Sequence, residues 1–452
     1  MAAGSKRGIW ATLVALSMGM LVFGLAESYG PVVSASDLLS QSNSWLGYSV
    51  PFVAGGFGAL VAGYLAERLG RKASFMLTAA MILVGLTLYL PVALGALPSS
   101  STLGLADLVA SMVLVGMAAI GLETPVLAMI AESAAAKERG KYLVITQNFG
   151  NLGVALAWVP MAILGLSSAR AQTLTYIVAL VLMFVGPLVG LVVAWLKVTE
   201  SLPWTAMKEG RSLLDAWREV DSSSEVVTPT AGLGLRLFVL ITLGVVQDVG
   251  FIYFVYEAPG LFRGELLGTS LGVLVPMLGG FLMTVVGIVT GLTIAGSVSR
   301  KAFTLASFGL MAALWVALWA VGAVSGFAAN VAVLALFALL MVPTELTWAA
   351  RALLEPELFP TRGRGLYVSL VRASVWIASG IITGLLALES VPLPAALAAV
   401  TAVMAVGIIS SAIWYAKGFE TAGKSLAGLD LGLLEAGAGV PIGAGDNYKE
   451  AR

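Results

Sequence analysis

The strongest constraint on this chain is the recurrence of long apolar runs. A helix that crosses a bilayer needs about 20 predominantly apolar residues, and the sequence contains twelve runs of this kind. They occupy residues 9–30, 45–66, 74–97, 108–132, 142–166, 174–196, 236–258, 270–294, 302–323, 328–352, 365–388 and 393–416. The chain of 452 residues is 59% hydrophobic and 11% charged, which is typical of an integral membrane protein. We therefore predict an all-α protein with twelve transmembrane helices.

Lysine and arginine are distributed unequally between alternate loops. Under a twelve-helix count, one side of the membrane carries nearly all of them, and the other side carries mainly Arg170 and Arg263. Because cytoplasmic loops are enriched in Lys and Arg, we expect both termini to be cytoplasmic. We expect the protein to span the cell (plasma) membrane many times as a monomer.

The longest polar stretch, residues 197–235, divides the apolar runs six and six. This predicts two six-helix bundles, residues 1–196 and 236–417, joined by a cytoplasmic linker. Within the linker, S-L-L-D-A-W-R-E-V favours a short amphipathic helix on the membrane surface. Residues 418–452 are rich in Gly and Ala, so we expect a loosely ordered cytoplasmic tail.

Two charged signatures repeat along the chain. Glu132 precedes Arg139-Gly140 by seven residues, and Glu357 precedes Arg364-Gly365 by the same interval, 225 residues further on. Arg71-Lys72 recurs 229 residues later. Chance recurrence at membrane-edge loops is the alternative, but the matching loop positions favour two duplicated halves. Such parallel repeats are a transporter design in which the halves rock around a midplane site.

The absence of certain residue types excludes several functions. The chain has no cysteine and no histidine, which excludes disulfides, thiolate metal sites and cysteine nucleophiles. Proton handling near neutral pH must therefore fall to carboxylates. A phosphate loop, a metal cluster and a catalytic triad are all missing, so we expect neither a cofactor nor enzymatic activity. The net charge of zero gives no argument for nucleic acid.

Four segments carry a resemblance to a known family. G-Y-L-A-E-R-L-G-R-K, residues 63–72, resembles the loop motif between the second and third helices of the major facilitator superfamily, with Glu67 where the family usually has Asp. Residues 125–141, 199–211 and 357–365 resemble loop segments of its sugar-porter branch and metabolite:proton symporter relatives. The resemblance extends from about residue 20 to about residue 390 and implies secondary transport by alternating access.

The same loops pair acidic and basic residues at helix ends. Contacts between these charges could hold a cytoplasmic gate shut and break when it opens; alternatively, the charges only fix topology. We expect Glu67 to contact the other half of the molecule when the inner gate closes. The candidate gate residues are Glu67, Arg68, Arg71, Glu132, Arg139, Glu200, Glu357 and Arg364.

The resemblance also implies substrate residues. A glutamine eight residues after Arg139, as Gln147 is, contacts substrate in sugar porters, and residues 247–259 resemble the family's helix-seven pattern. Apolar residues replace two amide positions of that pattern, which weakens the case for a sugar. Interhelical hydrogen bonding is the alternative role for the glutamines, and packing is the alternative for Trp348. The candidate substrate residues are Gln147, Gln247, Asp248, Tyr256 and Trp348.

Ionisable residues inside apolar runs are functional candidates, because burying a charge in a membrane is costly. Glu27 and Glu123 have no obvious basic partner in the first half, since Met112 occupies the place of the family's helix-four arginine. We predict that they carry protons. Glu345 and Arg372 come to similar depths on antiparallel helices, so they could form a gating or structural ion pair.

The sequence thus predicts a secondary transporter that moves a small polar organic solute, a sugar or an organic acid, by proton symport. An uncoupled facilitator, an organic cation or anion transporter and a non-transporting sensor of the same fold remain as alternatives. The state of Arg372 distinguishes a sugar from an organic anion as the substrate. An unpaired Arg372 that points into the central cavity favours an anion, whereas an Arg372 paired with Glu345 is compatible with a sugar.

Overall fold

The chain is described by a computed structural model that covers residues 6–36, 38–164, 169–221, 227–257, 274–326, 331–388 and 391–435. Every regular element in those ranges is a helix, and eleven helical segments are long and apolar enough to cross a membrane. One further helix, α6 (Ala136–Leu164), has 29 residues and packs along α1. Its polar residues Gln147, Asn148 and Asn151 make it less apolar than the others. The predicted all-α membrane fold is confirmed.

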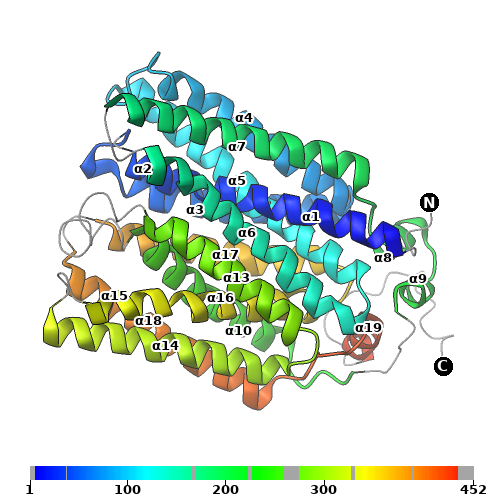
Figure 1. The fold of residues 1–452 in the computed structure, drawn as a ribbon. Helices are drawn as coiled ribbons and strands as arrows, with labels where there is room; N and C mark the ends of the chain where they lie inside the picture. The colour runs from blue at the N-terminus through cyan, green and yellow to red at the C-terminus, as the bar shows by residue number, and fades with distance from the viewer. Residues whose placement is uncertain are drawn as a thin grey trace.

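The helices form two groups along the chain (Figure 1). The N-terminal bundle contains α1 (Lys6–Glu27), α2 (Tyr29–Ala35), α3 (Leu46–Arg68), α4 (Arg71–Ala93), α5 (Thr102–Ser133), α6 and α7 (Ala169–Lys197). A single 3₁₀ turn, Gln41–Asn43, precedes α3. Two short helices follow α7, namely α8 (Leu202–Glu209) and α9 (Leu213–Val220).

The C-terminal bundle contains α10 (Leu233–Phe251), its π-helical continuation η2 (Ile252–Glu257), α13 (Leu274–Thr293), α14 (Arg300–Ser325), α15 (Val331–Leu339), α16 (Met341–Glu357), α17 (Arg364–Leu386) and α18 (Leu393–Lys417). The last helix is α19 (Leu426–Glu435). Figure 1 shows α8, α9 and α19 together at one end of the bundles, which we name the linker end. The bundles meet where α17 packs along α3 and α13 packs along α6.

Three predicted spans are not continuous α-helices. The first breaks at Ser28, whose hydroxyl donates to the carbonyl of Gly24 at 3.0 Å. The seventh changes to π-helix at Ile252. The tenth breaks at Leu340, because Pro343 has no N–H to donate and its ring conflicts with the preceding turn. Broken helices in membrane proteins occur where the backbone lines a cavity, and all three breaks lie near the cavity described below.

The outer surface of the bundles is apolar, as a lipid-facing surface requires. Aromatic side chains are exposed near the linker end of four helices: Trp10 on α1, Tyr64 on α3, Trp195 on α7 and Tyr415 on α18. Trp and Tyr favour the boundary between hydrocarbon and water. These residues therefore mark one edge of the membrane-embedded region.

The start of the tail differs from the expectation of a loosely ordered segment. Over residues 418–435 the chain packs on the linker end, and α19 is buried along much of its length. Asp430 accepts hydrogen bonds from Thr361 N at 2.8 Å and from Trp217 Nε1 of α9 at 3.2 Å. The predicted linker helix is therefore present as α9, but its tryptophan packs against α19. Residues 436–452 lie outside the described residues.

Close helix packing inside the N-terminal bundle depends on glycine. A Cβ added to Gly116 of α5 would lie 2.1 Å from the backbone carbonyl oxygen of Pro51 in α3, whereas a Cβ added to Gly309 of α14 would meet nothing within 4 Å. Because a backbone atom cannot rotate away as a side chain can, a side chain at Gly116 would force α3 and α5 apart. The small residue at this crossing lets the two backbones touch.

We expect Gly116→Ala to destabilise the bundle by about 1–3 kcal/mol, because it overpacks a contact with rigid backbone. Gly309→Ala is the matched control, since alanine in an open helical position costs nothing and favours the helix by roughly 0.5–1 kcal/mol. The measurement is the thermal unfolding midpoint of each variant in detergent. Equal midpoints for the two variants would contradict this account of the crossing.

Candidate functional site

A cavity lies between the two bundles, with an empty volume of about 300 Å³ that includes space open to solvent. Its walls come from α1 and α6 of the N-terminal bundle and from α10, α13, α16 and α17 of the C-terminal bundle. The polar lining residues are Glu27, Asn151, Gln247, Asp248, Thr344 and Glu345. The apolar lining residues are Phe23, Phe251, Met283, Trp348 and Trp376. Apolar walls with a few polar groups are typical of small-molecule sites.

Glu27 occupies the last position of α1, where the first span breaks. Its side chain is 5% exposed and lines the cavity. Within the described residues it has neither a hydrogen bond nor an ion pair, and the charged groups that act on it are the carboxylates Glu123 and Asp248. In the described part of the chain Glu27 is thus a buried acid without a basic partner, where the sequence analysis found none in the first half.

Glu123, the second predicted proton carrier, is held in an ion pair across the bundles. Its carboxylate contacts the guanidinium of Arg372 on α17. Arg372 also lies 2.7 Å from Glu355 of α16, and Glu355 lies 3.0 Å from Arg351. The sequence argument found no partner for Glu123 because it considered the first half alone.

Arg351 of α16 extends this chain of charges to α10. It donates to Asp248 Oδ1 at 2.6 Å and contacts the side-chain oxygen of Gln247. Arg351 and Arg372 therefore bind three carboxylates, those of Glu123, Asp248 and Glu355. All of these charged side chains are at most 3% exposed.

The predicted Glu345–Arg372 ion pair is wrong. Glu345 accepts hydrogen bonds from Asn148 Nδ2 at 2.7 Å and Asn151 Nδ2 at 2.6 Å, both on α6. At a rise of ~1.5 Å per residue, Glu345 lies roughly 6 Å further than Arg372 from the linker end. The long arginine side chain instead reaches Glu355 and Glu123.

The predicted substrate residues fall into two groups. Gln247, Asp248 and Trp348 line the cavity, and the ring of Trp348 lies 6.3 Å from that of Phe23. Gln147 is buried outside the lining, and neither atom of its amide has a hydrogen-bond partner within the described residues.

Tyr256, the fifth predicted substrate residue, also packs beside the lining. Its hydroxyl lies 3.2 Å from that of Ser28, and its ring stacks on Phe52 and Trp158. The tyrosine thereby connects η2 to the break in the first span, next to Glu27.

The sequence analysis missed several residues of the site. Those that line the cavity are Phe23, Asn151, Phe251, Met283, Thr344 and Trp376, and those beside it include Asn148 and Glu355. A helical signal existed for two of them, because Asn151 follows Gln147 and Trp376 follows Arg372 by four positions, on the same helix face. Asn148 carried no such signal.

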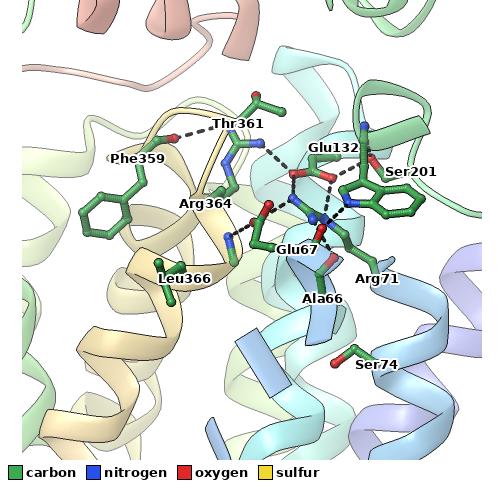
Figure 2. A network of polar contacts seen from close by, with 12 residues as sticks. Ala66, Glu67, Arg71, Ser74, Glu132, Ser201, Phe359, Thr361, Arg364 and Leu366 are labelled. Carbon is green, nitrogen blue, oxygen red and sulfur yellow. Dashed lines mark hydrogen bonds and ion pairs between the residues drawn. The ribbon is translucent and has the colours of Figure 1, made fainter. Parts of the chain in front are cut away.

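At the linker end, each bundle repeats one arrangement of charges. In the N-terminal bundle, Arg71 of α4 lies 3.3 Å from Glu132, and Ser201 donates to Glu132 Oε2 at 2.5 Å. Glu200 accepts from the backbone N–H groups of Arg71 and Lys72 at 3.0 and 3.1 Å, where an acid stabilises a helix N-terminus. Figure 2 shows Glu132 between Arg71 and Ser201.

The C-terminal bundle builds the same arrangement from the corresponding residues. Arg300 of α14 lies 3.3 Å from Glu357, and Thr421 donates to Glu357 Oε2 at 2.5 Å. Glu420 accepts from the backbone N–H of Arg300 at 2.9 Å and from that of Lys301 at 3.5 Å. The repeat found in the sequence is therefore a structural repeat, and it extends to the acid that follows the last span of each bundle.

Two arginines cross between the bundles and join the two networks. Arg364 of α17 lies 3.0 Å from Glu132, and Arg139 of α6 lies 2.9 Å from Glu357. In Figure 2, Arg364 reaches from its helix toward Glu132. Glu67 of α3 accepts from the backbone N–H of Gly365 at 2.9 Å, which is a contact with the other half of the molecule.

Arg68 is the exception among the predicted gate residues. It is exposed, and its guanidinium lies 5.3 Å from the ring centre of Tyr64 on its own helix. Asp430 of α19 adds a further acid at this end, 3.6 Å from Arg364. Burial raises the pKa of Asp430 above that of an ordinary aspartate, although Arg364 and the hydrogen bonds from Thr361 oppose the shift.

We expect Arg364→Gln to open the linker end, because it removes one crossing pair while Glu132 keeps Arg71 and Ser201. The chain has no native cysteine, so Ser369→Cys, at a buried position of α17 beside Gly63 of α3, reports opening through maleimide labelling.

The labelling rate should rise about tenfold in Arg364→Gln, which corresponds to roughly 1.4 kcal/mol. Arg218→Gln is the control, since Arg218 pairs with Asp215 on the exposed surface of α9. An unchanged rate in Arg364→Gln would show that the crossing pair does not hold this end closed.

Comparison with known proteins gives the family. The model of the Major Facilitator Superfamily matches residues 8–383. The solved structure of the proton:xylose symporter XylE bound to 6-bromo-6-deoxy-D-glucose is 19% identical with a TM-score of 0.77, covering 94% of this chain and 99% of that chain. A partially occluded inward-open conformation of XylE from E. coli is 16% identical with a TM-score of 0.69, covering 92% and 99%.

The human organic anion transporter MFSD10 is also similar, at 15% identity and a TM-score of 0.62, covering 90% of this chain and 99% of that chain. No relative is found among curated proteins. At these identities the solved structures establish the fold, and the family model extends over most of the chain. The chain therefore belongs to the Major Facilitator Superfamily, a family of multi-pass membrane transporters.

Proposed function

We propose that this protein is a proton-coupled secondary transporter that moves a small organic solute through the central cavity by alternating access. The observation that carries the proposal is Glu27, a buried acid that lines the cavity without a basic partner in the described residues. A buried carboxylate is costly unless it is paired or neutralised. Protonation neutralises it, so a change of exposure between the two sides would load and release a proton.

The linker-end networks supply the gate in this proposal. Arg364–Glu132 and Arg139–Glu357 join the bundles, and each glutamate keeps a second arginine within its own bundle. Opening therefore breaks one contact of each glutamate without leaving an unpaired buried carboxylate, which would cost several kcal/mol. With lysine and arginine concentrated at this end, we propose that it faces the cytoplasm of a cell bounded by the plasma membrane.

An organic acid is the weaker of the two substrates expected from sequence. The arginine that would bind it, Arg372, is paired with Glu123 and Glu355 and is not among the residues that line the cavity. A sugar is better supported than an organic acid. Gln247 and Asn151 offer amide groups to hydroxyls, and XylE is described as a xylose symporter.

We expect Glu27→Gln to abolish pH-driven accumulation while exchange of labelled solute at equal pH persists, because glutamine keeps the shape but cannot release a proton. The measurement uses proteoliposomes under an imposed pH gradient with labelled D-xylose, lactate and tetraethylammonium as probes. Glu209→Gln is the control, since Glu209 is exposed and pairs only with exposed Arg211.

Accumulation that persists in Glu27→Gln would rule out Glu27 as the proton carrier. Transport by the unaltered protein that merely equilibrates each probe, with no response to the pH gradient, would replace proton coupling with facilitated diffusion. Failure of all probes to move would contradict the transport function for these solute classes.

A further inference from the structure

The charges buried in and next to the cavity do not balance. Two of the buried groups are basic, Arg351 and Arg372, and five are acidic: Glu27, Glu123, Asp248, Glu345 and Glu355. Both arginines are paired with acids of this group, namely Glu123, Asp248 and Glu355. The remaining acids, Glu27 and Glu345, have no basic partner in the described part of the chain, and both line the cavity.

Glu345 is positioned for a charged role. Amide N–H groups of Asn148 and Asn151 each donate to one of its two carboxylate oxygens, at 2.7 and 2.6 Å. A carboxylate that accepts at both oxygens keeps further lone pairs for a third donor. Its negative charge is thereby solvated by neutral groups, and a positive charge in the cavity is the partner that the site lacks.

Aromatic rings make up much of the remaining wall. Trp348 and Trp376 of the C-terminal bundle and Phe23 and Phe251 line the same cavity as the two acids, and no lysine or arginine is among the lining residues described. The faces of aromatic rings attract organic cations, most strongly when the cation is removed from water. Acids and aromatic rings together are suited to a cationic head with apolar substituents.

We propose that the transported solute is a small organic monocation, such as an alkyl- or arylammonium ion, whose charged centre binds at the cavity acids Glu27 and Glu345 against the aromatic wall. The proposal rests on the transport function argued above and names its substrate class. It replaces the sugar and the organic acid with a positively charged solute.

Proton and substrate then compete for the same carboxylates. When the cation binds a protonated acid, the O–H bond of the carboxyl group breaks, the proton leaves to water, and the carboxylate pairs with the cation. Charge balances, because one positive charge replaces another. The coupling is therefore an exchange, in which protons move one way and the organic cation the other.

Other ionisable groups around these acids favour the same outcome. Glu123 from α5, Asp248 from α10 and Tyr256 from η2 act on Glu27, and none of them is basic. The groups that face Glu345 from α6 are the amides of Asn148 and Asn151. Raising the pH deprotonates the carboxyl groups of Glu27 and Glu345, so cation binding should strengthen as the pH rises.

The test is equilibrium binding of tetraethylammonium, choline and phenethylammonium to the purified full-length protein in detergent, beside D-xylose and lactate. We expect at least one cation to bind about tenfold or more tightly at about pH 8 than at about pH 5.5, with release of protons on binding. Glu345→Gln and Trp348→Leu should each weaken binding of that cation at about pH 8 about tenfold. The thermal unfolding midpoint of each variant confirms that it folds. Glu209→Gln is the matched acid-to-amide control and should bind normally.

Transport gives an independent readout. Proteoliposomes that are acidic inside should accumulate the bound cation, because protons leaving the vesicle drive it inward. Accumulation in vesicles that are basic inside would overturn the exchange. If no cation binds, the substrate class is wrong. If D-xylose or lactate accumulates under the pH gradient instead, the substrate class is wrong while proton-coupled transport stands. If a cation binds but no probe crosses the membrane, the transport function itself fails.

Discussion

Compensation of buried charge is the constraint on which the rest of this structure depends. A bundle that is apolar on its outer surface has no water to solvate an ionised side chain inside it, so each buried charge must find a partner or be neutralised. At the linker end the buried Glu132 and Glu357 each meet two arginines. In the cavity the rule is broken at Glu27 and Glu345. The places where it is broken are those to which we assign function.

In the transport cycle that we propose, the two networks let one molecule be both tightly packed and able to move. Each half keeps its own arginine, glutamate and hydroxyl, so it can remain a rigid body. Arg139, Arg364 and the contact of Glu67 with Gly365 supply the polar contacts described above between the halves at this end. Rigid halves joined by a few replaceable contacts are what rocking motion requires. The docked helix α19 adds Asp430 beside Arg364, which connects the tail to the same contacts.

Helix discontinuities tie the fold to the cavity. Glu27 lies at the break of the first span, Tyr256 lies in the π-helical turn, and Glu345 follows the break at Leu340. A broken span frees backbone groups and turns side chains away from a regular helix face. The breaks at Ser28 and Leu340 both have a cause in the sequence, because Pro31 and Pro343 each follow the break by three positions. The π-helical turn also contacts a distant segment, since its Tyr256 lies beside Ser28.

The sequence by itself determined the helical class, the apolar spans and the duplicated charges at helix ends, because bilayer thickness and the cost of buried charge act on local stretches of chain. It also identified most of the buried acids, since a charge within an apolar run is visible without a fold. Only the tertiary structure decided which charges pair. Glu123 pairs with Arg372 of the other half, and Glu345 accepts hydrogen bonds from two asparagines of α6. These partners depend on the rotation of each helix and the reach of each side chain, which are set by packing between distant segments. Residues such as Glu67 could be assigned to a helix end from sequence, but their partners lie about 300 positions away and become neighbours only when the two bundles meet.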